Sequence, residues 1–277
     1  MLESNPAFRP APRPKEGARL RRAREAAAAR RIADTGEIVP AVEPEARVIA
    51  LNLAAREMAE APRTRSETAN RVVNFVLALL AIVALAPVFA LVALIVLATS
   101  RGPVIYVQER VGIDRRARRT LAMYDRRGSD VGGCVFEIYK FRTMRVDAEQ
   151  HSGAVWATRN DPRVTLVGRV LRRTRLDELP QLFNVLRGDM NIVGPRPERP
   201  TIFRDLRENI AEYPLRQRAK PGITGLAQIN HNYDSCLDDV RTKVSYDLQY
   251  LARQSLWQDI KIMLKTIPVM IFKKGGW

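Results

Sequence analysis

The sequence has little of what builds disulfides or metal centres. Its 277 residues include two cysteines, Cys134 and Cys236, and two histidines, His151 and His231. The cysteines lie far apart with no CxxC spacing, which excludes a disulfide framework and a zinc site and predicts a reducing, cytoplasmic setting. Neither histidine belongs to an HExxH-like pattern, so metal chemistry would rest on carboxylates and favour a hard ion such as Mg²⁺.

Aromatic residues are scarce as well, at 6% of the chain, whereas basic residues are abundant. Lys and Arg total 46 against 30 Asp and Glu, a net charge of +16, which favours anionic partners. No basic stretch interleaved with aromatic side chains and no nucleic-acid motif is present, so we predict no nucleic-acid partner. Membrane lipids account for the same charge, because each basic residue near anionic lipid contributes about 1 kcal/mol.

Composition divides the chain into three parts. Residues 1–70 lack a hydrophobic period and are rich in Pro, Ala, Arg and Glu, which predicts a disordered basic tail. Residues 71–100 are almost wholly apolar and predict a membrane helix, which begins too far into the chain for a secretory signal peptide. Residues 101–277 have the hydropathy of a soluble protein and predict one catalytic domain.

The apolar segment contains a single proline, Pro87, which predicts a bend near Ala86. The whole segment reaches about 40 Å, enough for one tilted span, but its halves reach only about 22 and 18 Å, too short for a hydrocarbon core of roughly 30 Å. Basic residues flank both ends, which favours a re-entrant helix with both ends on the cytoplasmic side. A proline-kinked spanning helix stays open on these residues alone.

Short elements are predicted beyond the membrane segment. Alternation predicts strands over 104–112 and 134–144, joined by a basic surface loop at 113–135. Apolar spacing predicts helices over 164–173 and 179–186, and Gly188 ends the second.

The last sixty residues hold one irregular and one helical stretch. Residues 225–235 have no clear period and are expected to be irregular. Residues 255–277 carry apolar positions at helical spacing with interleaved lysines, typical of a helix at a membrane interface. An ordinary core helix fits this pattern equally well.

The chemistry-bearing segment is 172–200, RRTRLDELPQLFNVLRGDMNIVGPRPERP. Thr174 is predicted as an N-cap, which places Asp177 and Glu178 in the first turn of a helix. The helix macrodipole there stabilises carboxylates and attracts phosphate, although acidic residues in a first turn are also ordinary caps.

Arginines surround this carboxylate pair. Arg172 and Arg173 stand directly upstream, and Arg196 is held between two prolines. Because Arg grips phosphate oxygens bidentately and a carboxylate pair can hold Mg²⁺, these residues predict a phosphate site.

Four ordered blocks resemble a known family. They are KFRTM at 140–144, DPRVTLVGRVLRRTRLDELPQL at 161–182, NVLRGDMNIVGPRP at 184–197 and KPGITGLAQIN at 220–230. These blocks resemble the bacterial sugar transferases of the monotopic polyprenyl-phosphate phosphoglycosyl transferase family, from about residue 71 to 273. The resemblance implies the compact catalytic-domain type, with an α+β, mainly helical fold. In it, the re-entrant helix precedes a small cytoplasmic catalytic domain with short strands and interfacial amphipathic helices.

The resemblance also implies a reaction at the cytoplasmic face of the bacterial inner membrane. A hexose-1-phosphate moves from a UDP-sugar to undecaprenyl (polyprenyl) phosphate with release of UMP, the first membrane step of exopolysaccharide or glycoconjugate synthesis. Asp177 would be the nucleophile that carries the phosphosugar, and Glu178 would assist proton transfer or metal binding. Mg²⁺, held by Asp177 and Glu178, and fixed cations would offset the charge on the phosphoryl group.

Four further residues match the family by position. Lys140, Arg172 and Arg196 are expected to contact phosphate, and Asp247 is expected in a supporting role near the metal or the carboxylate pair. For each of them a surface salt bridge is the alternative.

One departure from the family pattern concerns the substrate. Members often have NGR where this chain has Asn230, His231 and Asn232, so an arginine that helps to hold substrate is missing. The sugar and the oligomeric state, a homo-oligomer included, stay open. A catalytically inactive membrane adaptor of a polysaccharide assembly complex is the alternative function.

Overall fold

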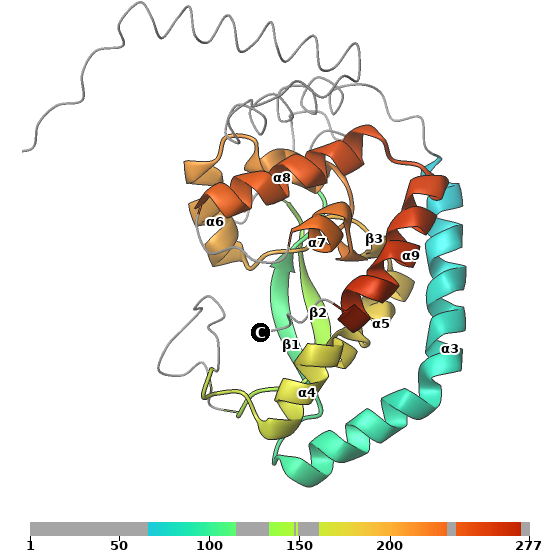
Figure 1. Ribbon diagram of the computed structural model, residues 1–277, viewed down its shortest axis with the longest axis vertical. Coiled ribbons are helices and arrows are strands. Elements are labelled where there is room, and N and C mark those ends of the chain that lie inside the picture. Colours follow the sequence, from blue (N-terminus) through green and yellow to red (C-terminus); the bar gives the residue numbers. More distant parts are fainter. Residues whose placement is uncertain (1–65, 115–132, 147, 149–160, 232–236, 273–277) are drawn as a thin grey trace, which may run out of the picture. The chain divides into compact units, whose positions relative to one another are not determined.

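A computed structural model of the chain describes residues 66–114, 133–146, 148, 161–231 and 237–272 (Figure 1). All of these belong to one of the two units into which the chain divides, Ala55–Trp277. The predicted tail at 1–70 lies outside the described residues except for its last five positions, and most of the basic loop at 113–135 also lies outside them.

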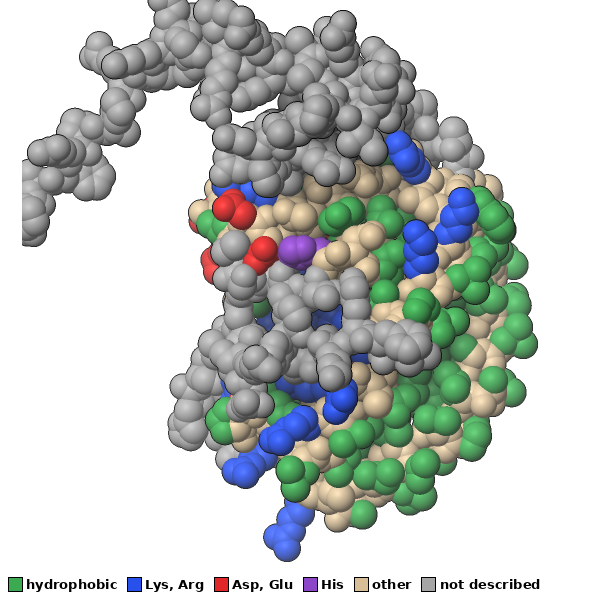
Figure 2. Space-filling view, viewed as in Figure 1, with side chains coloured by type: hydrophobic (Ala, Val, Ile, Leu, Met, Phe, Trp, Pro, Cys, Tyr) green, Lys and Arg blue, Asp and Glu red, His purple; other side chains and the backbone are tan. Residues whose placement is uncertain are grey.

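The first element is helix α3, Glu67–Thr99, which starts after Ser66, whose hydroxyl accepts a hydrogen bond of 3.3 Å from the Ala69 amide. Pro87 lies inside the helix, and Figure 1 shows that the helix axis turns sharply a little beyond its midpoint, as the proline predicts. Within the described part of the chain, α3 is the one helix long and apolar enough to cross a membrane, by length and composition. Most of its apolar side chains are exposed, and Figure 2 shows them covering its outer face.

The two predicted strands form an antiparallel hairpin, β1 (Ile105–Val111) and β2 (Val135–Phe141). Val111, Ile138 and Phe141 of the hairpin are nearly fully buried, and each belongs to a different core cluster. The predicted strands are therefore confirmed, and Lys140 is carried by β2.

Three short helices follow and carry the carboxylate pair: α4 (Leu166–Thr174), the 3₁₀ turn η2 (Leu176–Glu178) and α5 (Gln181–Arg187). The predicted N-cap at Thr174 is wrong, because Thr174 ends α4 and its hydroxyl donates to the carbonyls of Val170 and Leu171 at 2.9 and 3.1 Å. Arg175 adopts a left-handed conformation, with φ 56° and ψ 17°, which ends α4 and turns the chain into η2.

The remaining chain contributes a second small sheet and a helical layer. Strands β3 (Asn191–Val193) and β4 (Gly222–Thr224) pair in parallel. The other elements are α6 (Pro200–Asn209), η3 (Tyr213–Arg218), α7 (Leu226–Asn230), α8 (Leu237–Ala252) and α9 (Leu256–Phe272). The chain is thus mainly helical with short strands, as the expected α+β class requires.

Two expectations about the C-terminal part are revised. Residues 226–230 form α7, so the stretch from 225 is not irregular throughout, and residues 232–236 lie outside the described residues. Helix α9 has two faces: Ile262 is buried in the core, while Trp257 and Leu264 are 64% and 61% exposed. Both expected features, core packing and an apolar exposed side, belong to the same helix.

Candidate active site

Asp177 and Glu178 lie together in η2 and are both buried, with 8% and 7% of their surfaces exposed. The left-handed Arg175 before them and Pro180 after them fix this short turn between α4 and α5. Adjacent carboxylates with little water around them repel one another, so nearby cations decide which of the two is ionised more readily.

Glu178 is surrounded by cationic side chains. Its Oε1 lies 2.6 Å from Nη2 of Arg196 and 3.3 Å from Nζ of Lys140, and its Oε2 lies 3.6 Å from Nη1 of Arg175. Burial raises the pKa of Glu178, but Arg196 and Lys140 outweigh burial and hold the pKa well below its usual value. Glu178 is therefore ionised at neutral pH, and both of its oxygens are engaged.

Asp177 is the less compensated carboxylate. No hydrogen bond to its side chain is formed by any residue that the structure describes. Burial and the charge of Glu178 raise its pKa to about 6, against the opposing effect of Lys140 and Arg172. At neutral pH Asp177 is mostly ionised yet hydrogen-bonded to no residue in the described ranges, which is the state that a nucleophile or metal ligand requires.

Arg172 reaches the pair from α4. Its Nε donates to Oγ1 of Thr143 at 2.9 Å, and its positive charge lowers the pKa of Asp177. The start of α4 is fixed by Thr165, whose hydroxyl accepts from the Gly168 amide at 2.9 Å. The structure thus brings five predicted site residues together: Lys140, Arg172, Asp177, Glu178 and Arg196. Lys and Arg side chains also gather around α4 in Figure 2.

Asp247 lies behind this group on α8 and is almost fully buried. Its Oδ2 lies 2.9 and 2.7 Å from Nε and Nη2 of Arg216, and the same Nη2 donates to the Arg196 carbonyl at 2.9 Å. Asp247 therefore connects to Glu178 through Arg216 and Arg196. These contacts hold the loop that carries Arg196, and direct contact between Asp247 and substrate stays a prediction.

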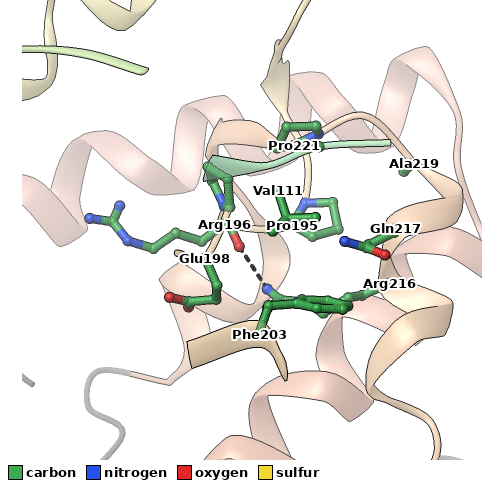
Figure 3. A pocket seen from close by; sticks show the side chains of 11 residues that line it. Val111, Pro195, Arg196, Glu198, Phe203, Arg216, Gln217, Ala219 and Pro221 are labelled. Carbon is green, nitrogen blue, oxygen red and sulfur yellow. Dashed lines mark hydrogen bonds between the residues drawn. The ribbon is translucent and has the colours of Figure 1, made fainter. Parts of the chain in front are cut away.

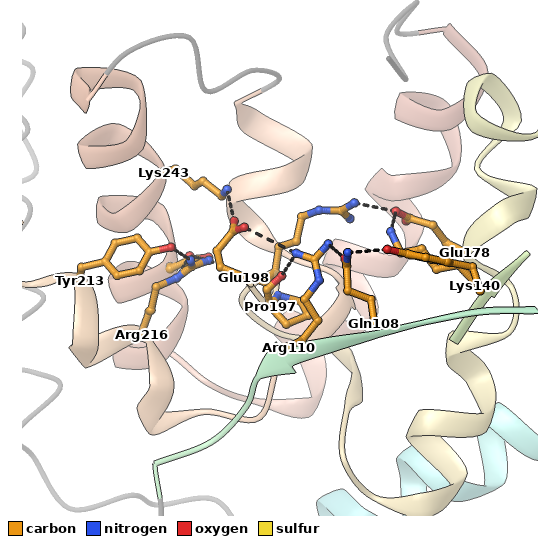
Figure 4. A network of polar contacts seen from close by, with 12 residues as sticks. Gln108, Arg110, Lys140, Glu178, Pro197, Glu198, Tyr213, Arg216 and Lys243 are labelled. Carbon is orange, nitrogen blue, oxygen red and sulfur yellow. Dashed lines mark hydrogen bonds and ion pairs between the residues drawn. The ribbon is translucent and has the colours of Figure 1, made fainter. Parts of the chain in front are cut away.

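A further acidic residue of this region, Glu198, was not predicted from the sequence. It lies 3.0 Å from Nζ of Lys243 and 3.7 Å from Nη1 of Arg110, which also donates to the Pro197 carbonyl at 3.0 Å. Burial opposes ionisation, but Lys243 and Arg110 lower the pKa of Glu198 to about 2. Figure 4 shows this network extending from Arg216 through the Pro197 loop to Lys140 and Glu178.

Residues 195–198 of the same loop line a pocket together with Arg216 (Figure 3). Pro195, Pro197 and Phe203 supply apolar walls, and Gln217 lies at its edge. The side-chain amide of Gln217 is buried without a hydrogen-bond partner in the described part of the protein. The loop is thus held by ion pairs and also borders this pocket.

Asn184 is another missed residue, and it joins α5 to β2. Its side chain is fully buried, donates to the Glu137 carbonyl at 2.6 Å and accepts from the Tyr139 amide at 3.0 Å. Because Lys140 follows Tyr139, this pair of bonds holds the lysine strand against the helix that follows η2. Only the NVLRGDMN block contained a signal for it, since a lone Asn in a helix has no pattern of its own.

The donor set fits a magnesium ion that keeps substrate and water ligands. No group of three or more His, Cys, Asp or Glu side chains suited to a metal occurs in the ranges that the structure describes. Mg²⁺ is commonly bound by one or two carboxylates together with substrate phosphates. Asp177 has its carboxylate open to such an ion, whereas Glu178 already contacts three cations.

Comparison with known proteins shows the family to which the chain belongs. Residues 65–273 match the bacterial sugar transferase family. An Aeromonas hydrophila UDP-N-acetylgalactosamine-undecaprenyl-phosphate N-acetylgalactosaminephosphotransferase is 40% identical over 207 residues, which are 75% of this chain and 44% of that protein.

Two further relatives are UDP-glucose:undecaprenyl-phosphate glucose-1-phosphate transferases. The one from Escherichia coli K12 is 42% identical over 72% of this chain and 39% of its own length. The one from Caulobacter vibrioides is 38% identical over 76% of this chain and 72% of its own length. The chain belongs to the bacterial sugar transferase family. It spans less than half the length of the Aeromonas and Escherichia relatives.

Proposed function

We propose that the protein transfers a hexose-1-phosphate from a UDP-sugar to undecaprenyl or another polyprenyl phosphate and releases UMP. The observation that carries this proposal is the buried Asp177, whose pKa is about 6, beside a neighbouring carboxylate that is fully paired with cations. The relatives' names supply the substrate class, and they include both glucose and N-acetylgalactosamine donors.

The reaction proceeds in two displacements at phosphorus. In the first, a carboxylate oxygen of Asp177 attacks the β-phosphorus of the donor, the bond from that phosphorus to the bridging oxygen breaks, and UMP leaves with this oxygen. In the second, a phosphate oxygen of the polyprenyl phosphate attacks the same phosphorus, and the bond to Asp177 breaks. The carboxylate is regenerated, and a difficult displacement is divided into two easier steps.

The cations act on charge and position. Arg172 and Arg196 are suited to bind phosphate oxygens in fixed orientations, and Lys140 adds a positive charge close to both carboxylates. Ionised Glu178 holds Lys140 and Arg196 in place through contacts of 3.3 and 2.6 Å. A Mg²⁺ ion held by Asp177, with Glu178 beside it, would offset negative charge on the transferring phosphoryl group.

The membrane supplies the acceptor. We place α3 in the cytoplasmic leaflet as a re-entrant helix, because Pro87 bends it and basic residues flank both of its ends. Exposed apolar residues on two other helices, Leu166 and Val170 on α4 and Trp257 on α9, suit contact with the lipid interface. The site would then face the cytoplasm, where nucleotide sugars occur.

The test of this function is UMP release by the purified protein in detergent or nanodiscs, with Mg²⁺, undecaprenyl phosphate and a panel of UDP-sugars. We expect release with at least one donor and none from Asp177→Asn, which keeps the side-chain shape but removes the nucleophile. Absence of release from the wild-type protein with every donor would favour the membrane adaptor instead. Unchanged polysaccharide production in cells that carry Asp177→Asn would do the same.

A further inference from the structure

Helix α3 carries a buried polar side chain in the middle of apolar sequence. Asn74 is 4% exposed, although its neighbours along the helix are mostly exposed hydrophobic residues. Its Oδ1 accepts a hydrogen bond of 2.7 Å from the Ile192 amide in β3. Its Nδ2 donates to the backbone and side-chain oxygens of Asn70 at 2.8 and 2.7 Å. The oxygen and the nitrogen of the Asn74 side chain are thus both hydrogen-bonded to protein atoms, and the bond to Ile192 fixes this part of α3 against β3.

Arg71, one turn earlier, makes a second attachment to the same region. Its guanidinium donates to the carbonyl of Val185 at 2.5 Å and to the carbonyl of Leu186. These carbonyls belong to the last turn of α5, where the helix dipole favours a cation, and the Val185 carbonyl also accepts from the Gly188 amide at 3.0 Å. Gly188 follows with φ 91°, and a Cβ there would come within 3.2 Å of the Arg71 guanidinium. The turn is thus shaped to admit this arginine.

Apolar packing surrounds the two polar attachments. Ala78 of α3 is fully buried and belongs to one cluster with Leu182, Val185 and Met190. The first half of α3 is therefore fixed to residues 181–193, the segment that directly follows the carboxylate pair. This segment connects η2 to β3 by way of α5, so a displacement of α3 relative to it also displaces the membrane relative to Asp177.

The ion pairs of Glu178 with Lys140 and Arg196 do not involve residues of α3. Lys140 comes from β2 and Arg196 from the loop after β3, and the hydrogen bonds of Asn184 to β2 use no residue of α3. The second half of α3 reaches this region through apolar packing on Phe141 and Leu171. A water-soluble nucleotide sugar can reach the site wherever the membrane lies. A lipid phosphate can reach the site only where the membrane brings it, because the bilayer that holds α3 also sets the depth and lateral position of the lipid.

We propose that Asn74, together with Arg71, is a positioning residue that sets where Asp177 stands relative to the lipid acceptor. Loss of the Asn74 bonds then impairs the second displacement and leaves the first intact. The inference rests on the proposed function, since it needs a water-soluble donor and a membrane-bound acceptor that react in turn.

The experiment compares the two half-reactions in full-length protein in nanodiscs. UMP released in a single turnover without acceptor measures the first, and kcat and KM for undecaprenyl phosphate measure the second. The variants are Asn74→Leu, which removes all three side-chain hydrogen bonds, and Asn74→Asp, which keeps the acceptor for the Ile192 amide. Thr99→Val is the matched control, because the Thr99 hydroxyl donates within its own helix, to the Ile95 carbonyl at 2.6 Å.

We expect Asn74→Leu to keep the rate and amplitude of the UMP burst within about twofold while kcat/KM for the acceptor falls at least about tenfold. Asn74→Asp should recover most of that loss, and Thr99→Val should match the wild type. An equal fall in both half-reactions would mean a purely structural role and would overturn the inference, as would an unchanged acceptor reaction in Asn74→Leu. If the wild type itself releases no UMP, the proposed function fails and this inference fails with it.

Discussion

Two adjacent carboxylates in one short turn have opposite electrostatic environments. Glu178 receives Arg196, Lys140 and Arg175, and its pKa falls, whereas Asp177 is buried beside that negative charge and its pKa rises to about 6. The difference gives the two carboxylates different roles. Glu178 holds the cations in place, and Asp177 stays available for bond formation. The same division between neighbouring acids is a general way to obtain reactive and structural roles from identical chemistry.

The pKa of Asp177 predicts the pH dependence of the first half-reaction. A raised pKa means that the protonated, non-nucleophilic form accumulates as pH falls through about 6. We expect the second-order rate constant for single-turnover UMP release from the UDP-sugar without acceptor to be level above that pH and to fall about tenfold per unit well below it. The donor diphosphate does not titrate in this range, so a profile that stays level to pH 4.5 would contradict the assignment.

Glu198 gives a prediction for stability. Its pKa of about 2, against a usual 4.5, means that it stabilises the fold fully above pH 4.5 and that this contribution is lost as pH falls through about 2. Glu198→Gln leaves Lys243 and Arg110 buried without their carboxylate, which costs about 3 kcal/mol, or a Tm lower by about 6–12 °C at neutral pH. Thermal unfolding in detergent measures this.

Two comparisons make the Glu198 prediction specific. Glu208→Gln changes an exposed glutamate on α6 and should leave Tm unchanged. The Tm difference between wild type and Glu198→Gln should also narrow as pH falls below 4.5, because protonation removes the same charge. Equal Tm values for wild type and Glu198→Gln at neutral pH would show that the ion pairs contribute nothing.

At the scale of elements, periodicity identified α5, both strands of the hairpin and the stop at Gly188. It failed where one residue departs from regular backbone. Thr174 matches an N-cap by residue type, but the left-handed Arg175 moves the helix boundary and makes Thr174 the end of α4. No sequence pattern distinguishes these cases, because a left-handed arginine is set by the packing of the turn. Helix α7 was missed because its five residues are too few for a helical period.

The close packing of α4 on Thr143, two residues after β2, predicts that a larger side chain at Gly168 lowers stability. A Cβ there would lie 2.0 Å from the Thr143 carbonyl oxygen, so α4 would have to move away. We expect Gly168→Ala to lower stability by about 1–3 kcal/mol in spite of the better helix propensity of alanine. UMP release should fall too, because Arg172 is on the same helix and bonds the Thr143 side chain.

Arg169→Ala is the control for this change, since the adjacent Arg169 is exposed on the same helix. It should change Tm by little. If Gly168→Ala unfolds at the same temperature as Arg169→Ala and keeps full activity, the close contact between α4 and Thr143 is not a feature of the working protein.

At the scale of the whole molecule, sequence reasoning identified the long apolar helix, the soluble-type part after it and five of the residues that meet at the site. Lys140 was found because its block resembles a family, whereas the carboxylate pair, Arg172 and Arg196 were also found from their grouping within residues 172–200. The residues that support them were not. Asn184 and Glu198 act through partners distant in sequence, Glu137 and Lys243, and such pairing is visible only after folding.

The re-entrant placement of α3 predicts that both of its ends lie on one side of the membrane. In a background that lacks Cys134 and Cys236, Ser66→Cys and Ser100→Cys flank the helix at its caps. In intact cells both should resist an impermeant thiol reagent, and in inverted vesicles both should react. Labelling of the two positions from opposite sides would show that α3 spans the bilayer despite the bend at Pro87.

The most direct measurement for the central claim is the mass of the protein after incubation with its UDP-sugar and Mg²⁺ in the absence of acceptor. The account predicts an added hexose phosphate on the peptide that contains Asp177, which disappears when polyprenyl phosphate is supplied. Product formation at full rate with no adduct on that peptide, under conditions that trap acyl phosphates, would contradict it.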